Sequence, residues 1–309
     1  MWHSIGAENL RLRKQEMAEP VHRAGAVAIL GRPNAGKSTL LNHLLGEKLA
    51  IVSAKPQTTR SRILGIVNRE HAQILLYDTP GMHESPKALN IALNELVDEA
   101  ARDCDLVLLL VDPYLGWGED HTDLLRRMQA RPCPVLIVST KGDLHNRDAD
   151  ALTAAVPDGA HVWRISARTG NGVEALISEV ASRLPESPPL YPVDQISDRP
   201  MRFLAAELVR EAAFDVLSQE LPYALAVEVI EYDESREDLL KIRADLLVER
   251  ATQKQIVIGK GGQNIKRIGI RSRHEIERLT GSKVHLDLWV KVEPKWSKRP
   301  KRLKSLGYS

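Results

Sequence analysis

Short apolar runs alternate with longer amphipathic segments through the first 185 residues of the chain. Continuous apolar runs of five or six residues are typical of strands in a parallel sheet that is covered on both faces. The runs that we predict as strands are 26–30, 72–77, 105–111, 134–139 and 161–166, and the intervening segments predict helices, among them 38–45, 89–102 and 172–184. Regular alternation of strand and helix predicts a doubly wound, mostly parallel α/β domain. We place this domain at residues 25–185.

The pattern changes after a proline-rich segment, PESPPLYP at 185–192, which predicts a stiff linker. We take residues 186–199 as the linker. Beyond it, the apolar spacing predicts helices at 200–221, 251–258 and 263–280 and strands at 223–232, 239–248 and 283–292. This α-β-β-α-α-β order predicts a smaller α+β domain over residues 200–309.

Residues 1–24 lack apolar periodicity and are expected to form a disordered N-terminal extension, in which Met17 is an alternative start. No segment approaches the roughly 18 consecutive apolar residues that span a bilayer, and no apolar stretch follows the basic N-terminal residues. We therefore expect a cytoplasmic protein. Cys104 and Cys133 lie far apart without a CxxC pattern, so we expect two reduced thiols and no zinc site.

Charge is distributed unevenly although the whole chain carries only +2. The formal charge is −2 over residues 1–190, −8 over 191–240 and +12 over 241–309. A surface that binds a polyanion is therefore expected only in the last 70 or so residues.

The strongest motif, GRPNAGKS at 31–38, directly follows the first predicted strand and opens a helix. It matches the phosphate-binding pattern GxxxxGK[ST], in which glycines let backbone N–H groups wrap the phosphates at a helix N-terminus. Lys37 can reach the β- and γ-phosphates, and the hydroxyl of Ser38 can ligate Mg²⁺. The predicted nucleotide contacts here are Gly31, Arg32, Pro33, Asn34, Ala35, Gly36, Lys37, Ser38 and Thr39.

A second motif, DTPG, follows the strand 72–77 and supplies Asp78, Thr79, Pro80 and Gly81. Asp78 can hold Mg²⁺ directly or through water, and Gly81 permits close approach to the γ-phosphate. Between the two motifs lies QTTR, where a loop threonine can ligate Mg²⁺ and sense the γ-phosphate; we choose Thr59, with Thr58 as the alternative. The predicted catalytic residues are thus Lys37, Thr59 and Gly81, and the predicted Mg²⁺ ligands are Ser38, Thr59 and Asp78.

Two later segments predict the base specificity. In TKGD at 140–143, a carboxylate can accept both N1–H and N2–H of guanine, a pair of donors that adenine lacks. The predicted contacts are Thr140, Lys141 and Asp143, together with Ser166 and Ala167 at the end of the last strand. GTPases usually have Asn at the position of Thr140, and this departure is expected to loosen nucleotide binding.

Met82 follows Gly81, where Ras-like enzymes often place a water-orienting Gln. The enzyme must therefore position its nucleophile in another way or hydrolyse slowly. The sequence shows no obvious in-chain arginine finger, and Arg60 or Arg62 is left open for that role.

The segment VIGKGGQNIK contains a GxxG loop between two predicted helices, which is the signature of a KH domain. Such a loop clamps about four nucleotides through its backbone. The predicted RNA contacts are Ile258, Gly259, Lys260, Gly261, Gly262, Lys266, Arg267 and Arg271. Trp289, which lies on the polar face of its strand, either stacks a base or packs under the C-terminal segment, and we favour packing. The basic tail 295–304 suits phosphates or a membrane surface.

With these motifs in place, the chain resembles the Era family of bacterial ribosome-assembly GTPases across about residues 25–309. Further segments that carry the resemblance lie outside the generic GTPase motifs: ISDRPMRF, ELPYALAVEV and VHLDLWVKVEPKW. The resemblance implies a P-loop GTPase domain followed by a type II KH domain. It implies GTP hydrolysis coupled to binding of the 3′ end of small-subunit (16S) ribosomal RNA during 30S subunit maturation, in a monomer that associates loosely with the cytoplasmic membrane. It also implies a K⁺ ion held by Asn34.

Two other functions are compatible with parts of the sequence. A guanine-nucleotide sensor whose useful work is RNA chaperoning, with negligible turnover, is the alternative; the intact set of Lys37, Ser38, Thr59 and Asp78 favours hydrolysis. An ATP-dependent kinase or helicase is disfavoured by the TKGD segment.

Overall fold

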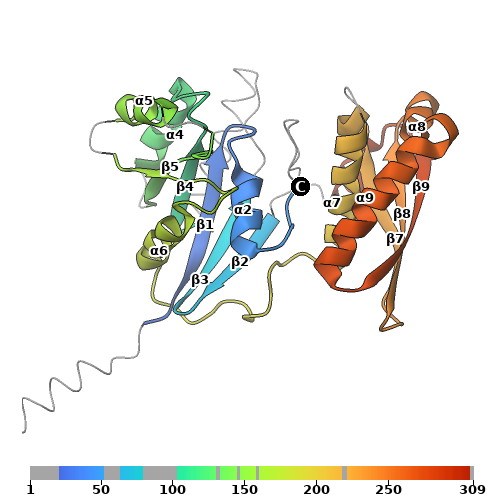
Figure 1. The fold of residues 1–309 in the computed structure, drawn as a ribbon, viewed down its shortest axis with the longest axis horizontal. Helices are drawn as coiled ribbons and strands as arrows, with labels where there is room; N and C mark the ends of the chain where they lie inside the picture. Colours follow the sequence, from blue (N-terminus) through green and yellow to red (C-terminus); the bar gives the residue numbers. More distant parts are fainter. Residues whose placement is uncertain are drawn as a thin grey trace, which may run out of the picture.

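The computed structural model describes residues 21–51, 63–78, 103–129, 133–144, 147–157, 160–217 and 221–306. Figure 1 shows two units joined by the segment that precedes α7. Most of the N-terminal extension and all of the predicted helix 89–102 lie outside the described residues.

The first unit, here called the G domain, is built on a sheet in the order β2-β3-β1-β4-β5-β6. Its strands are β1 (Arg23–Gly31), β2 (Ile63–Arg69), β3 (Ala72–Asp78), β4 (Leu106–Val111), β5 (Val135–Ser139) and β6 (Val162–Arg164). All neighbours pair in parallel except β2, which is antiparallel to β3. The five predicted strands are present. We did not predict β2, whose apolar run is interrupted by Gly65, a residue that weakens strand propensity.

Helices cover both faces of this sheet, which explains why its strands are apolar throughout (Figure 1). The described helices are α2 (Lys37–Leu45), α4 (Glu119–Gln129), α5 (Arg147–Ala155) and α6 (Val173–Arg183). The cluster on one face includes Leu40, Leu41 and Leu176, whereas the other includes Leu124, Met128 and Leu152. Helices α4 and α5 lie in two of the segments between strands that we predicted as helical without giving their bounds.

The linker lies along the outer edge of β2. Ile66 N donates a hydrogen bond to Ile196 O at 2.9 Å, and Ser197 Oγ donates one to Leu64 O at 2.6 Å. The Gln73 side chain accepts hydrogen bonds from the backbone N–H groups of Leu190 and Tyr191 at 2.7 and 2.8 Å. These contacts cover an edge that would otherwise expose unpaired backbone groups.

The second unit, here called the KH domain, has a sheet in the order β7-β8-β9, with β8 antiparallel to β7 and parallel to β9. Its elements are α7 (Met201–Val216), η1 (Leu221–Ala224), β7 (Ala226–Asp233), β8 (Leu239–Val248), α8 (Ala251–Ile258), η2 (Lys260–Gly262), α9 (Gln263–Thr280), β9 (Lys283–Val292), η3 (Trp296–Lys298) and α10 (Pro300–Ser305). The predicted α-β-β-α-α-β order is confirmed. Helix α7 ends five residues earlier than predicted, at Val216, and Leu217 after it has an extended backbone.

The two domains meet at the start of α7, where Leu204 belongs to the same apolar cluster as the G-domain core and Met201 and Phe203 pack against that cluster. Lys48, in the loop after α2, lies between two carboxylates of the KH domain, 3.0 Å from Glu211 of α7 and 3.3 Å from Glu275 of α9. Burial alone would lower the pKa of Lys48, but the two carboxylates outweigh it and raise that pKa. The side chain of Glu211 is only 6% exposed, so Lys48 neutralises a charge that water barely reaches.

Candidate nucleotide site and RNA interface

The described segments predicted to bind nucleotide all follow the carboxyl ends of strands. The phosphate loop follows β1, Asp78 ends β3, Thr140 follows β5 and Ser166 follows β6. In open α/β sheets, ligands bind at this edge, where the strand order reverses direction. Here β1 lies between β3 and β4, so the phosphate loop opens at the reversal itself.

Lys37 is folded onto the phosphate loop in the described structure. Its Nζ donates to the carbonyl oxygens of Gly31 at 3.1 Å and Arg32 at 3.0 Å. Burial lowers the pKa of Lys37, although nearby Asp78 partly opposes this effect. Gly36 caps α2 with φ of 93°, a conformation that favours glycine, and thereby turns the loop into the helix. A phosphate oxygen placed in this loop would offer the ammonium a charged acceptor in place of two neutral ones.

Ser38 and Asp78 are brought together across two elements. Ser38 Oγ donates a hydrogen bond to Asp78 Oδ2 at 2.8 Å, and Asp78 is fully buried. Hydroxyl and carboxylate oxygens are the donors that Mg²⁺ prefers, so this pair fits a magnesium ion. Asn34, the residue implied for K⁺, has a left-handed backbone with φ of 62°.

The base-specificity segments form two hydrogen-bonded loops. Ser166 Oγ donates to Asp143 Oδ1 at 2.7 Å, and Gly142 N donates to Ile165 O at 3.0 Å. The hydrogen bond from Ser166 is the main reason that the pKa of Asp143 is lowered. Asp143 is exposed and Ala167 is half-buried beside it, so an ionised carboxylate is presented at the surface for a base.

Thr140 is buried and does not face this surface. Its N–H and its Oγ1–H both donate to Val111 O, at 3.0 and 3.3 Å. The side chain also lies 3.8 Å from where a Cβ of Gly36 would be. Thr140 therefore packs beneath the phosphate loop.

Asp112, after β4, was missed by the sequence analysis. Its Oδ2 lies 2.6 Å from Nζ of Lys141, whose backbone is left-handed with φ of 57°. The signal that could have found it is its position, since it directly follows an apolar strand as Asp78 does.

Other predicted residues lie outside the described part of the chain. They are Thr58, Thr59, Thr79, Pro80, Gly81, Met82, Arg60 and Arg62.

The GxxG loop joins α8 to α9 as predicted. Gly259 has φ of 75° and ψ of 170°, a region that is essentially restricted to glycine. A Cβ there would also lie 3.0 Å from Asn264 N, and the Asn264 side chain in turn donates to Ile256 O at 2.8 Å. Lys260 and Gly261 are exposed, so a backbone with a positive charge is presented at the surface.

A groove of about 320 Å³ lies beside this loop, between α9 and β9. It is lined by apolar and basic residues: Ile265, Lys266, Gly269, Ile270, Arg273, Leu286 and Leu288. Ile270 is 45% exposed, so the groove offers apolar contact area to a ligand. An apolar floor with a basic rim suits unstacked bases and their phosphates.

The other predicted RNA contacts are placed differently. Lys266 and Arg267 are exposed on α9, and Ile258 is half-buried at the end of α8. Arg271 forms an ion pair with Asp215 of α7 at 3.1 Å, which neutralises part of its charge.

Trp289 does not pack under the C-terminal segment, so our preferred expectation was wrong. It is 57% exposed and donates a hydrogen bond to Asp287 Oδ2 at 2.7 Å. Trp296 fills the packing role instead, because it is 2% exposed and clusters with Ala226, Leu247 and Leu306.

The basic tail is folded onto the outer face of the KH sheet. Arg302 pairs with Glu228 at 2.6 Å and with Glu293 at 2.9 Å, and Arg299 also pairs with Glu293. The four tail lysines remain exposed: Lys295, Lys298, Lys301 and Lys304. Among the described residues, no helix is long and apolar enough to cross a bilayer.

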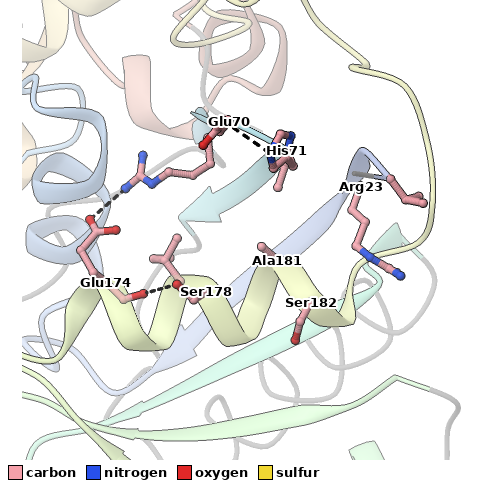
Figure 2. Close-up of a pocket in the computed structure, with 11 residues that line it drawn as sticks. Arg23, Glu70, His71, Glu174, Ser178, Ala181 and Ser182 are labelled. Carbon is pink, nitrogen blue, oxygen red and sulfur yellow. Dashed lines mark hydrogen bonds and ion pairs between the residues drawn. The ribbon is translucent and has the colours of Figure 1, made fainter. Parts of the chain in front are cut away.

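A pocket of about 430 Å³ lies at the opposite end of the G-domain sheet, at the starts of β1 and β3 against α6 (Figure 2). Its charged side chains pair with one another or with neighbours: Arg69 with Glu174 at 3.2 Å, and Arg23 with Glu186 at 3.4 Å. Figure 2 shows Arg23, Glu70, His71 and Glu174 around the pocket, with Ser178, Ala181 and Ser182 along α6.

Comparison with known proteins matches both domains. A family described as 50S ribosome-binding GTPase matches residues 26–141, and the KH domain family matches residues 220–297. GTPase Era of Pseudomonas aeruginosa is 48% identical over 293 residues, which cover 93% of this chain and 95% of that protein.

Two solved structures are also similar over nearly the whole chain. One is Era in complex with MgGDPNP and nucleotides 1506–1542 of 16S ribosomal RNA, with a TM-score of 0.83 at 36% identity. The other is a variant of Aquifex aeolicus Era bound to GDP·AlF4⁻, with a TM-score of 0.81 at 37% identity. Each comparison covers 93% of this chain and 99% of the solved one.

Proposed function

The chain belongs to the Era family of GTPases, and from this membership we propose that it is a GTP-hydrolysing switch that binds the 3′ end region of 16S ribosomal RNA and assists 30S subunit maturation. One observation carries the proposal. The similarity to the Era complex that holds both MgGDPNP and this RNA segment extends over both domains, not over the G domain alone.

The two sites have the chemistry that this function needs. The phosphate loop supplies backbone N–H groups and Lys37 for a triphosphate, and Asp143 supplies the carboxylate for guanine. Magnesium, when bound by Ser38 and Asp78, would neutralise charge that develops on the phosphates. On the KH domain, the GxxG loop and the groove beside it offer backbone, apolar and basic contacts to single-stranded RNA.

Two contacts of the G domain, one with the linker and one with the KH domain, supply a physical route for the switch. Strand β2 begins three positions after the end of the QTTR segment that we predict to sense the γ-phosphate, and Leu64 of that strand is hydrogen-bonded to Ser197 of the linker. Lys48, which follows the helix of the phosphate loop, holds Glu211 and Glu275 of the KH domain. A change in the G domain would therefore alter contacts that position the KH domain.

The remaining features of the proposal follow the family resemblance. They are catalytic roles for Lys37, Thr59 and Gly81, a K⁺ ion at Asn34, a monomeric state, and a cytoplasmic location with loose membrane association. The exposed lysines 295, 298, 301 and 304 support attraction to anionic headgroups. We keep the boundaries 25–185, 186–199 and 200–309 for the G domain, linker and KH domain.

The test is the affinity of the purified chain for RNA that matches the 3′ end of its own 16S ribosomal RNA, at fixed salt, with a non-hydrolysable GTP analogue or GDP bound. We expect tighter binding with the analogue. Gly261→Asp should abolish binding, because it adds a negative charge on an exposed loop position whose φ is 59°. Equal RNA affinity in the two nucleotide states would contradict the switch and would favour two separate activities.

A further inference from the structure

The arginine of the phosphate loop is held by an acidic residue of α4. Arg32 Nε donates to Asp120 Oδ2 at 2.8 Å, and Arg32 Nη2 donates to the other carboxylate oxygen. A two-point contact of this kind sets the orientation of the guanidinium as well as its distance. The side chain of Asp120 is only 10% exposed, so water and salt screen the pair weakly.

The segment from Trp117 to His121 packs closely around the ion pair of Arg32 and Asp120. A Cβ on Gly118 would lie 2.1 Å from Arg32 Nη2 and 2.6 Å from Asp120 Oδ1, so a larger residue here would displace the paired side chains. Trp117 Nε1 donates to Thr122 Oγ1 at 2.8 Å, and its ring lies 5.2 Å from the ring of His121. These contacts fix the segment before α4 to the first turn of that helix.

His121 does not compete with Arg32 for the carboxylate of Asp120, because its ring is uncharged. His121 is 1% exposed, and its Nδ1 accepts a hydrogen bond from Gly118 N at 3.1 Å. Burial lowers the pKa of His121 to about 4 although Asp120 opposes the shift, so the ring is neutral near pH 7. Burial raises the pKa of Asp120, but the hydrogen bonds from Arg32 outweigh it and the pKa is lowered.

The backbone of Arg32 shapes the phosphate loop. Its carbonyl oxygen accepts hydrogen bonds from Lys37 Nζ at 3.0 Å and from Ala35 N at 3.2 Å. The residue whose side chain is held by Asp120 therefore also defines the turn on which Lys37 rests.

We propose that Asp120 is a positioning residue for nucleotide binding: it holds Arg32, and through Arg32 it keeps the phosphate loop and Lys37 in the geometry that a guanosine di- or triphosphate requires. This inference rests on the proposed function of the G domain. It differs from a model in which Arg32 itself contacts phosphate, because there Asp120 would compete for the guanidinium and its removal would tighten binding.

The test is equilibrium titration of a non-hydrolysable GTP analogue and of GDP into the full chain. We expect Asp120→Asn to weaken both affinities by about tenfold, which corresponds to about 1.4 kcal/mol. Arg32→Lys keeps the positive charge but cannot make the two-point contact, and we expect it to weaken binding similarly. In an Arg32→Gln background, Asp120→Asn should have no further effect, because the partner through which it acts is absent.

Asp123→Asn is the matched control, since Asp123 lies one turn along α4 in an exposed ion pair with Arg126 at 2.9 Å. Its nucleotide affinity should equal that of the wild type. RNA affinity and the thermal unfolding midpoint without nucleotide are measured for every variant. A variant that keeps both but loses nucleotide affinity is folded and has lost the positioning of the phosphate loop. If Asp120→Asn does not fold, Arg32→Lys provides the test instead.

Unchanged or tighter binding by Asp120→Asn would overturn the inference. The inference would also be overturned if Asp120→Asn weakened nucleotide binding as much in the Arg32→Gln background as in the wild type, because the effect would then come from the stability of α4. Failure of the wild-type chain to bind the GTP analogue would remove the proposed function, and this inference with it.

Discussion

At the residue scale, guanine recognition depends on a carboxylate that is already ionised and oriented. Asp143 is exposed and receives a 2.7 Å hydrogen bond from Ser166 Oγ. A carboxylate accepts from both N1–H and N2–H of guanine, whereas an amide pairs one acceptor with one donor. That pattern suits xanthine, which has an oxygen in place of the N2 amine.

We therefore predict that Asp143→Asn weakens GTP binding by about 100-fold or more and improves the binding of xanthosine triphosphate. Competition titrations with the two nucleotides measure this change. Ser166→Ala is the companion variant, which should weaken GTP binding less because the carboxylate remains. Unaltered preference for GTP in Asp143→Asn would assign base recognition to other residues.

His121 makes a second prediction at this scale, in which stability falls as the pH is lowered. Its pKa is lowered from 6.5 to about 4 in the folded protein, so the unfolded chain binds a proton first as the pH falls below about 6.5. The free energy of unfolding contributed by His121 is therefore fully present above pH 6.5 and is lost between pH 6.5 and 4. It should fall by about 2 kcal/mol between pH 7 and pH 5.

Urea unfolding at the two pH values, compared with His121→Gln, measures this contribution. The variant should show a shallower loss of stability on acidification. A ring-proton titration of His121 with a midpoint near 6.5 would show that the side chain is not buried as described.

At the scale of elements, the packing of α2 on β2 depends on a glycine in the strand, Gly65, which leaves room for leucines of the helix. A Cβ on Gly65 would lie 2.4 Å from Leu41 Cδ1 and 3.0 Å from Leu45 Cδ1. We predict that Gly65→Ala destabilises the G domain by about 1–3 kcal/mol through overpacking. Because α2 begins at the phosphate loop, GDP affinity should fall as well.

Gly46→Ala is the matched control on the same helix. A Cβ on Gly46 would meet nothing within 4 Å, but its φ is 69°, so the substitution should cost only about 1 kcal/mol of backbone strain and leave GDP affinity unchanged. Urea unfolding and GDP titration of both variants provide the comparison. Wild-type stability in Gly65→Ala would mean that α2 and β2 are not in this contact.

At the scale of the whole molecule, Lys48 is the charge through which the G domain holds two KH helices. Without it, Glu211 and Glu275 would face each other without the cation that now separates them. We predict that Lys48→Ala reduces the difference in RNA affinity between the GTP-analogue and GDP states severalfold, while nucleotide affinity changes less than about twofold.

Lys48→Arg is the control, because it retains the charge and should preserve the difference. RNA titrations of the wild type and the two variants, in both nucleotide states, carry the test. If Lys48→Ala kept the full difference in RNA affinity between the two nucleotide states, the coupling between the domains would have to run through the linker along β2 instead.

The local features of this protein can be predicted from the amino-acid sequence, because they depend on neighbouring residues. The strands β3, β5, β8 and β9, the helices α8 and α9, and the two glycine-rich loops follow from apolar periodicity and from glycines at fixed spacing. The family followed from the same motifs.

Features that depend on residues far apart in the chain become visible only in the folded structure. The fold placed β2 under the linker, set Trp296 rather than Trp289 against the outer face of the KH sheet, and paired Arg302 with Glu228. It also brought Asp120 to Arg32, Asp112 to Lys141 and Glu211 to Lys48. The physical reason is that a charged residue has no periodicity that identifies its partner: the packing of apolar surfaces sets which elements meet, and only then do their charges come within reach of one another.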